Sequence, residues 1–157
     1  METAYISTPM GVLEIKGDAI GLASVLFMDT EVSTSEVIPE VLLPVVTQLK
    51  EYLAKTRTEF QLSLNPEGTL FQKKVWKQLE SIPFGKTTSY QKMANSLGDP
   101  KVIRAAASAN GKNPIAIIIP CHRVIGSDGS LTGYASGLHR KKWLLEHESP
   151  YKQQSLF

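Results

Sequence analysis

The sequence predicts a mixed α/β protein in which a small sheet-and-helix domain precedes a mainly helical one. Three observations support this prediction. Runs with apolar residues at every second position occur before residue 68, whereas helical spacing and capping patterns follow it. The charge also changes sign, from a net −6 over residues 1–68 to a net +8 over residues 69–157. We therefore expect two domains, 1–68 and 69–157, separated by the proline- and glycine-containing turn at Asn65–Gly68.

The first domain is expected to contain three strands and one helix. Apolar runs, two of them alternating, predict strands at Gly11–Lys16, Ile20–Met28 and Thr58–Leu64. Helical spacing of apolar residues predicts an amphipathic helix within 41–53, with Pro44 near its start. Residues 29–39 lack periodicity and are expected to form a loop. The carboxylates of this domain are scattered, so we expect no catalytic cluster there.

The second domain begins with a helix capped by Thr69, with Gln72 three residues later. The expected apolar stripe of this helix comprises Leu70, Val75, Trp76, Leu79 and Ile82. The cap cluster at Thr87–Ser89 opens a short helix to about Leu97, and Pro100 opens another that Gly111 closes. Two short helices joined by a tight turn with glycine predict a helix-turn-helix.

The rest of this domain contains a short strand, a loop and a final helix. The β-branched run Ile115–Ile119 predicts a buried strand that ends at Pro120. A polar, glycine-rich loop over Gly126–Gly137 leads to a helix over His139–Glu148. We expect His139 and His147 to lie on the surface of that helix.

The composition excludes several classes of protein. A single cysteine excludes an internal disulfide and any zinc site built from two cysteines. The apolar run Ile115–Pro120 is far too short to cross a membrane. Glu2 near the start and the lack of a basic-then-apolar leader predict a cytoplasmic, intracellular protein.

The charge asymmetry is typical of a protein whose basic half binds a polyanion, although a merely solvated basic surface gives the same balance. Within Lys101–Asn110, alanines and a serine surround one arginine, Arg104. Specific readers of bases need more hydrogen-bonding side chains than this. A slim helix with one long cation suits the minor groove of DNA and little sequence specificity. The alternative is that Ala105–Ala109 pack tightly on a neighbouring helix.

The candidate reactive residue is Cys121, which follows Pro120 and precedes His122 and Arg123. A solitary cysteine is often an inert buried residue. Here, however, His122 and Arg123 are expected to make its surroundings electropositive and to favour the thiolate. Glu148 is a carboxylate available to orient the His122 imidazole, which completes a Cys–His–acid arrangement.

The residues around Cys121, together with several other stretches of the chain, resemble the O6-alkylguanine-DNA alkyltransferases, also called methylated-DNA–protein-cysteine methyltransferases. The match is most specific at Pro120–Val124 and continues over about Thr69–Glu148, with a looser match before Thr69. The other matching stretches are Gly68–Gln72 with Val75 and Trp76, Pro83–Tyr90, Arg104, Asn110–Pro114, Gly133 with Tyr134, and Trp143–Glu148. The resemblance implies a ribonuclease H-like N-terminal domain without nuclease chemistry, followed by a winged helix-turn-helix-like domain that binds DNA.

The resemblance also implies roles for individual residues. Cys121 is similar to the cysteine that accepts the alkyl group from O6 of guanine or from O4 of thymine. His122 is similar to the histidine that withdraws the proton of that cysteine, and Glu148 to the carboxylate that holds the imidazole. Asn113 resembles an asparagine that braces the active-site turn. Tyr134 resembles a tyrosine whose hydroxyl contacts the flipped base. The pocket positions are Val124, Ala135 and Ser136. Arg104 resembles the arginine that fills the vacated stack, and the phosphate-contacting positions are Tyr90, Gln91 and Ser127.

The implied reaction is direct reversal of damage on double-stranded alkylated DNA, once per molecule, because a thioether has no easy leaving group. We expect no cofactor, no metal, no membrane partner, and a monomer that binds DNA with or without cooperativity. Ala107 and Ser108 stand where many members of that family have a pair of glycines. Ser136 stands where they often have a further glycine, and we expect its side chain to narrow the pocket for the alkylated base. Three alternatives remain: a lesion sensor without transfer, a cysteine hydrolase, and a transcription regulator.

Overall fold

The computed structural model describes residues 1–150; residues 151–157, the end of the predicted second domain, lie outside the described part. The chain forms two compact units. The N-terminal unit contains Met1–Glu67 and also Pro114–Ala116, and the C-terminal unit contains Gly68–Asn113 and the residues from Ile117 onward. The chain therefore returns briefly to the first unit just before its cysteine.

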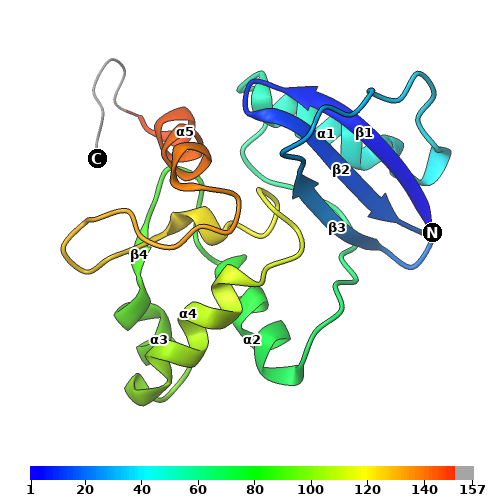
Figure 1. Cartoon of the computed structure of the whole chain (residues 1–157). Helices are drawn as coiled ribbons and strands as arrows, with labels where there is room; N and C mark the ends of the chain where they lie inside the picture. Colours follow the sequence, from blue (N-terminus) through cyan, green and yellow to red (C-terminus); the bar gives the residue numbers. More distant parts are fainter. Residues whose placement is uncertain (151–157) are drawn as a thin grey trace. The chain divides into compact units, whose positions relative to one another are not determined.

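The N-terminal unit is built on an antiparallel sheet of the order β1-β2-β3, drawn in blue in Figure 1. Its strands are β1 (Glu2–Thr8), β2 (Gly11–Gly17) and β3 (Leu22–Phe27). Alternate residues such as Ile6, Leu13 and Ile15 are buried, because successive side chains of a strand point to opposite faces. The predicted strands at 11–16 and 20–28 are confirmed, and β1 was not predicted.

One helix supplies the rest of this core. The 3₁₀ turn η1 (Glu40–Leu42) leads into α1 (Leu43–Leu53), with Pro44 in the first turn, where its missing N–H group leaves no hydrogen bond unmade. The buried face of α1 consists of Val45, Val46, Leu49 and Tyr52. The predicted amphipathic helix is confirmed.

The predicted strand at Thr58–Leu64 is wrong, because only Leu64 pairs, in an isolated parallel bridge with Leu22. The side chain of Gln48 on α1 takes the place of a neighbouring strand. Its Nε2 donates to the carbonyl of Gln61 at 3.2 Å, and its Oε1 accepts from the amide of Gln61 at 2.9 Å. These backbone groups are therefore satisfied without a sheet ladder.

The predicted buried strand at Ile115–Ile119 is also wrong. Ile115 alone pairs, with Val25 of β3, and the chain then turns. Ile117 has a φ of 71°, in the left-handed region that a β-branched residue rarely adopts. The run is apolar because it is buried, and its periodicity could not distinguish a buried turn from a buried strand.

The C-terminal unit is mainly helical (Figure 1). Its helices are α2 (Leu70–Leu79), α3 (Tyr90–Ser96), α4 (Ile103–Gly111) and α5 (Leu138–Glu148), with 3₁₀ turns η2 (Pro100–Val102) and η3 (Cys121–Arg123). The short strands β4 (Thr88–Ser89) and β5 (Val124–Ile125) pair in parallel. The α3–α4 pair occupies the positions predicted for the helix-turn-helix.

Local capping sets the starts of these helices as the sequence predicts. The Thr69 side chain accepts from the amide of Gln72, and the Gln72 side chain accepts from the amide of Thr69, which completes a capping box at α2. Ser89 caps α3 by accepting from the amide of Lys92 at 3.1 Å. Leu70, however, is 89% exposed and is not part of the buried stripe.

The small residues of α4 divide between two faces. Ala106 and Ala109 are buried, and the carbonyl of Ala109 accepts a 2.8 Å hydrogen bond from Trp76 Nε1 of α2. Arg104, Ala105 and Ser108 are exposed. The alternative of tight packing therefore holds for one face of α4, and the other face leaves its backbone open to close approach.

Candidate active site

Cys121 is the first residue of η3 and lies in a tight turn rather than at the end of a strand. Its amide donates to the carbonyl of Ile119 at 2.8 Å, around Pro120, which has no N–H group of its own. The residue is 6% exposed. The sulfur is therefore held by a rigid, largely buried segment.

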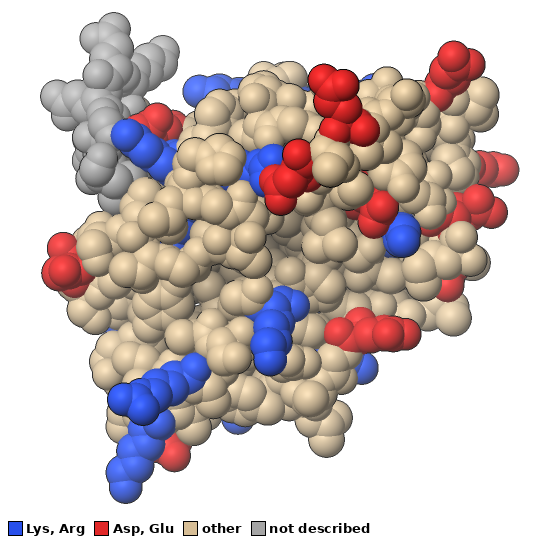
Figure 2. Space-filling model, in the orientation of Figure 1, with Lys and Arg blue, Asp and Glu red and all other residues tan. Residues whose placement is uncertain are grey.

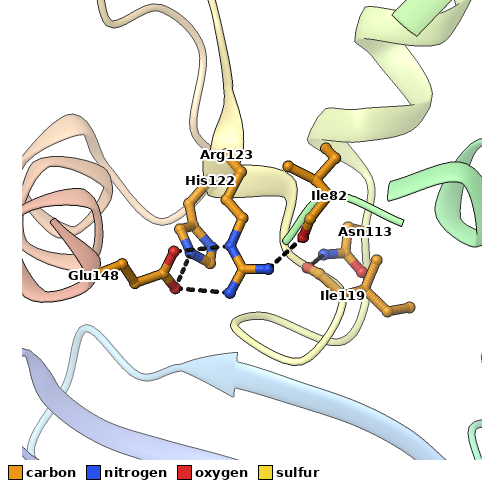
Figure 3. A network of polar contacts seen from close by, with 6 residues as sticks. All are labelled: Ile82, Asn113, Ile119, His122, Arg123 and Glu148. Carbon is orange, nitrogen blue, oxygen red and sulfur yellow. Dashed lines mark hydrogen bonds and ion pairs between the residues drawn. The ribbon is translucent and has the colours of Figure 1, made fainter. Parts of the chain in front are cut away.

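Asn110, near the end of α4, and Asn113, which follows the helix, hold this turn. Asn113 Nδ2 donates to the carbonyl of Ile119 at 2.8 Å, as Figure 3 shows. Asn110 Nδ2 donates to the carbonyl of Cys121 at 3.5 Å. The geometry agrees with a bracing role for Asn113, and it adds Asn110, to which the sequence analysis gave no role.

His122, Arg123 and Glu148 form a buried network between η3 and α5 (Figure 3). Glu148 Oε2 accepts from His122 Nε2 at 2.7 Å and from Arg123 Nη2 at 3.0 Å, and its Oε1 accepts from Arg123 Nε at 2.8 Å. Arg123 Nη1 donates to the carbonyl of Ile82 at 2.6 Å. The arginine therefore grips the carboxylate with two hydrogen bonds, which is the strong form of this pair.

The network fixes the protonation states of its members. Burial acts to raise the pKa of Glu148, but His122 and Arg123 overcome it and hold that pKa well below its usual range. Burial lowers the pKa of His122, against the effect of Glu148. Neutral His122 thus donates its Nε2 proton to an ionised carboxylate. Its Nδ1 has no hydrogen-bond partner among the described residues and remains a proton acceptor.

The electropositive surroundings expected from His122 and Arg123 are not what the structure contains. Burial raises the pKa of the Cys121 thiol, whereas the Asn113 side chain, the Lys141 charge and a backbone hydrogen bond act to lower it. The charge of Arg123 is matched by Glu148, and His122 is neutral. The expectation was wrong because it used neighbours along the chain rather than neighbours in space.

A hollow of about 730 Å³ opens in the C-terminal unit between α3, α4 and the loop before α5. It is lined by Tyr90, Ile103, Arg104, Ala107, Gly111, Thr132, Gly133, Tyr134 and Ala135. Burial raises the pKa of Tyr134 well above its ordinary value, and the charge of Cys121 adds to this effect. The same charge acts on Tyr90. Cys121 is thus close to two residues of the hollow without being one of its lining residues.

The two tyrosines of the hollow differ in their hydroxyl groups. Tyr90 donates to the carbonyl of Thr132 at 3.1 Å. The Tyr134 hydroxyl is buried and has no hydrogen-bond partner within residues 1–150. A buried hydroxyl without a partner is unfavourable by itself, so Tyr134 is prepared to bond a ligand.

The remaining predicted residues lie outside the lining of the hollow. Gln91 of α3 donates to Asn95 at 3.1 Å, and Ser127 is exposed in the loop after β5. Val124 is fully buried, and the carbonyl of Ser136 accepts from Arg140 Nη1 at 3.0 Å. The structure therefore brings Tyr90, Arg104, Tyr134 and Ala135 together in one hollow and leaves the others beside it.

The sequence analysis did not single out Lys141, whose charge acts on Cys121. This lysine is fully buried, and it shares one face of α5 with Leu144, Leu145 and Glu148. The spacing i, i+3, i+4, i+7 of these residues could have revealed it, because a charged residue in the apolar stripe of a helix must have a partner.

Comparison with known proteins identifies the family. A family model described as the DNA-binding domain of 6-O-methylguanine DNA methyltransferase matches residues 70–150, and one described as its ribonuclease-like domain matches residues 1–66. The chain belongs to the 6-O-methylguanine DNA methyltransferase family. The resemblance predicted from the sequence and the α/β fold class are thus confirmed.

Members of the 6-O-methylguanine DNA methyltransferase family align with nearly the whole of this chain. Proteins named methylated-DNA–protein-cysteine methyltransferase from Methanosarcina acetivorans and Mycolicibacterium paratuberculosis are 46% and 40% identical. The alignments cover 94% and 99% of this chain and 98% and 97% of those proteins. The crystal structure of Mycobacterium tuberculosis OGT in complex with DNA is 43% identical with a TM-score of 0.85, over 94% of this chain and 92% of that chain.

Residues 1–150 contain neither a helix that could span a membrane nor a side-chain cluster suited to a metal ion. No helix of this part combines the length and the apolar character that a membrane span requires. No three histidine, cysteine, aspartate or glutamate side chains of these residues form a group suited to a metal ion.

Proposed function

We propose that this protein repairs alkylated DNA by moving the alkyl group from O6 of guanine to Sγ of its own Cys121, once per molecule. The observation that carries the proposal is the placement of the chain's single cysteine next to His122, whose Nδ1 is a proton acceptor, in a member of this family. Residues 69–157 would then form the domain that binds DNA and reacts.

The His122–Glu148 pair accounts for activation of the thiol. The Cys121 thiol is protonated at rest, because burial raises its pKa. His122 Nδ1 takes that proton, through a water molecule, while Glu148 holds the Nε2 side of the ring at 2.7 Å. The thiolate then attacks the alkyl carbon: the S–C bond forms, the C–O6 bond breaks, and the electron pair passes to guanine. The guanine anion then takes up a proton, and the imidazolium of His122 releases to solvent the proton that it took from the thiol.

The hollow accounts for access to the base. An O6-alkyl group lies inside the duplex, so the nucleotide must be flipped out, which costs about a few kcal/mol. Arg104 on the exposed face of α4 is long enough to enter the vacated stack. The unpartnered hydroxyl of Tyr134 provides a hydrogen bond to the extruded base and favours its departure. We assign Ala135 to the wall of the base pocket, and Val124 and Ser136 to the segments behind that wall.

The surface of the C-terminal unit favours a DNA partner without sequence preference. In Figure 2, basic side chains gather over α3 and α4, whereas acidic ones predominate over the N-terminal unit. The small exposed residues of α4 suit the minor groove, and Tyr90, Gln91 and Ser127 are assigned to phosphates. The relative from Mycobacterium tuberculosis crystallised in complex with DNA supports this partner.

The product accounts for a single turnover. A thioether on Cys121 has no easy leaving group, and the chain has no second cysteine to accept the alkyl group. Neither step calls for a cofactor. The monomeric state, cooperativity on DNA and the cytoplasmic location predicted above stay predictions.

The decisive experiment mixes the protein with a duplex oligonucleotide that contains one O6-methylguanine. Intact-mass and peptide mass spectrometry should find one added CH₂ unit on the Cys121 peptide, with at most one methyl group transferred per protein molecule. Cys121→Ala should abolish transfer and keep DNA affinity. Binding without mass gain by the unsubstituted protein would favour a lesion sensor, and repeated turnover would favour a hydrolase.

A further inference from the structure

Lys141 of α5 is a buried lysine to which the mechanism above gives no role. Its side chain is 0% exposed, although lysine is almost never fully buried without a charged partner. Within residues 1–150 its ammonium group forms no ion pair with a carboxylate. Removing an ammonium group from water is unfavourable, so its neighbours must explain its position.

The hydrogen bonds of Lys141 join two segments that border the site. Nζ donates to the carbonyl of Val124 at 2.6 Å and to the carbonyl of Thr132 at 2.8 Å. Val124 directly follows the η3 turn that contains Cys121, and Thr132 lies two residues before Tyr134. A single side chain therefore ties the backbone that follows the Cys121 turn to the loop that lines the hollow.

The third N–H group of the ammonium is left for other contacts. Nζ lies 5.7 Å from the centre of the Tyr90 ring, a favourable arrangement of a cation over an aromatic face. It also interacts electrostatically with Cys121, lowering the pKa of the thiol, while the Cys121 thiolate acts to raise the pKa of Lys141. The attraction between the two charges is mutual.

Among residues 1–150, Lys141 is the charged side chain that acts on the Cys121 thiol. Burial lowers its pKa to about 8, so the ammonium is mostly protonated at neutral pH. Tyr90 from α3, Tyr134 from the loop and His122 from η3 are uncharged there, because burial raises the pKa of both tyrosines and lowers that of His122. The charge of Arg123 is matched by Glu148.

We propose that Lys141 is a positioning residue of the alkyl transfer, whose ammonium stabilises the Cys121 thiolate while its hydrogen bonds hold Val124 and Thr132 on either side of the site. This inference rests on the proposed function. It adds a cation to the Cys121–His122–Glu148 set: His122 accepts the proton, and Lys141 stabilises the charge that the proton leaves behind.

The test measures the ionisation of Cys121 and the rate of methyl transfer over a range of pH. Thiolate absorbance near the ultraviolet limit reports this one cysteine once the matching Cys121→Ser protein is subtracted to cancel the tyrosines. Lys141→Gln keeps a hydrogen-bond donor and removes the charge. It should raise the pKa of Cys121 by roughly one unit and slow transfer at neutral pH roughly tenfold, with the rates converging at alkaline pH.

Two further variants separate charge from packing. Lys141→Arg keeps the charge and should keep a pH profile close to that of the parent. Lys142→Gln removes a neighbouring lysine that is exposed and pairs with Glu146 at 4.0 Å, and it should leave the profile unchanged. An equal loss of rate at every pH in Lys141→Gln, with an unshifted thiol titration and a lower melting temperature, would overturn the proposal in favour of a structural role.

A measurement on a chain that keeps Lys141 guards against a variant that fails to fold. Carbon NMR of the lysine side chains can follow the titration of Lys141 in the parent and in Cys121→Ser. The titration of Lys141 should extend to higher pH in the parent than in Cys121→Ser, because the thiolate that forms as the pH rises favours the charged lysine; identical titration curves in the two proteins would overturn the proposal. Neither titration needs DNA. If the proposed function is wrong, no methyl group is transferred from the oligonucleotide, and this result is separate from the titrations that test the role of Lys141.

Discussion

The two units of the molecule differ in what they bury. In the N-terminal unit the buried side chains are apolar except for Thr8, and they follow the alternation of β1, β2 and β3 and the stripe of α1. The C-terminal unit buries polar or charged side chains at six described positions. They are Asn110, His122, Arg123, Arg140, Lys141 and Glu148.

This difference separates residues that stabilise the fold from residues that prepare chemistry. Burying an apolar side chain is favourable by itself. Burying a charged one is unfavourable unless hydrogen bonds and opposite charges compensate for it. The C-terminal unit therefore holds its charged groups where water is excluded and their electrostatic effects on one another are strong, around the sulfur that we propose as the alkyl acceptor.

The largest effect should come from the buried carboxylate. Glu148→Gln replaces one of the two acceptor oxygens by an NH₂ donor and leaves Arg123 buried without its counter-charge. Transfer should slow by about 100-fold or more, and the free energy of unfolding should fall by about 3–5 kcal/mol. Single-turnover kinetics and urea unfolding measure the two effects.

Glu146→Gln is the control for this substitution, because Glu146 lies on the same helix, is exposed, and should change neither quantity appreciably. Parent-like stability of Glu148→Gln would mean that the buried network of the C-terminal unit does not need its charge, and the contrast between the units would fail.

A large effect on stability alone is expected in the N-terminal unit. Leu49→Ala empties a fully buried position of α1 and should lower the free energy of unfolding by about 2–5 kcal/mol. The rate of transfer per folded molecule should stay at the parent value. Leu43→Ala, on the exposed side of the same helix, should change stability by less than about 0.5 kcal/mol. A slower transfer step in folded Leu49→Ala would show that the two units are not functionally separate.

A moderate effect confined to duplex DNA is expected from the exposed face of α4. Arg104→Ala removes the side chain assigned to the vacated stack, so transfer from duplex DNA should slow by about tenfold or more, since base extrusion costs about a few kcal/mol. Transfer from the free modified base should be unchanged. Lys73→Ala is the control, because it removes an exposed charge on α2 that does not line the hollow, and it should leave both rates close to those of the parent. Equal losses on duplex and free base would refute the role of Arg104 in extrusion.

A gradual effect is expected in stability as a function of pH. The pKa of Lys141 is about 8 in the folded protein and about 10.4 in an unfolded chain. Between these values the unfolded state binds more protons, so the stability of the parent relative to Lys141→Gln should rise with pH, by up to about 1 kcal/mol per unit. Thermal unfolding from pH 7.5 to 10 measures the trend. A flat difference would mean that Lys141 titrates normally and that its burial has no electrostatic consequence.

The sequence predicted the helices of both units because their signals are local. Capping by Thr69 and Ser89, the proline at the start of η2 and the stripe of α1 each involve residues within one or two turns. It failed at 58–64 and 115–119, where the strand-like composition reflects burial rather than pairing. In the first segment the partner is the Gln48 side chain, which lies 13 residues from Gln61 and has no signature in the pattern.

The candidate site shows the same division. The Cys121–His122 pair, Glu148 and Arg104 could be named from the sequence and its resemblance to a family. The neighbours that set the charge at Cys121 could not, because Lys141 is 20 positions away along the chain and acts through space. Arg123 was misjudged for the same reason, since adjacency in sequence concealed its hydrogen bonds to Glu148 on another element.

By itself the sequence determined the helices, the position of the single cysteine, the opposite charges of the two halves and the family. The tertiary structure alone decided which charge reaches the sulfur, which hydroxyl faces the hollow without a partner, and how the chain turns before Cys121. The physical reason is range: caps and amphipathic stripes depend on neighbours a few residues away, whereas electrostatic and hydrogen-bonded environments depend on distances that only folding establishes.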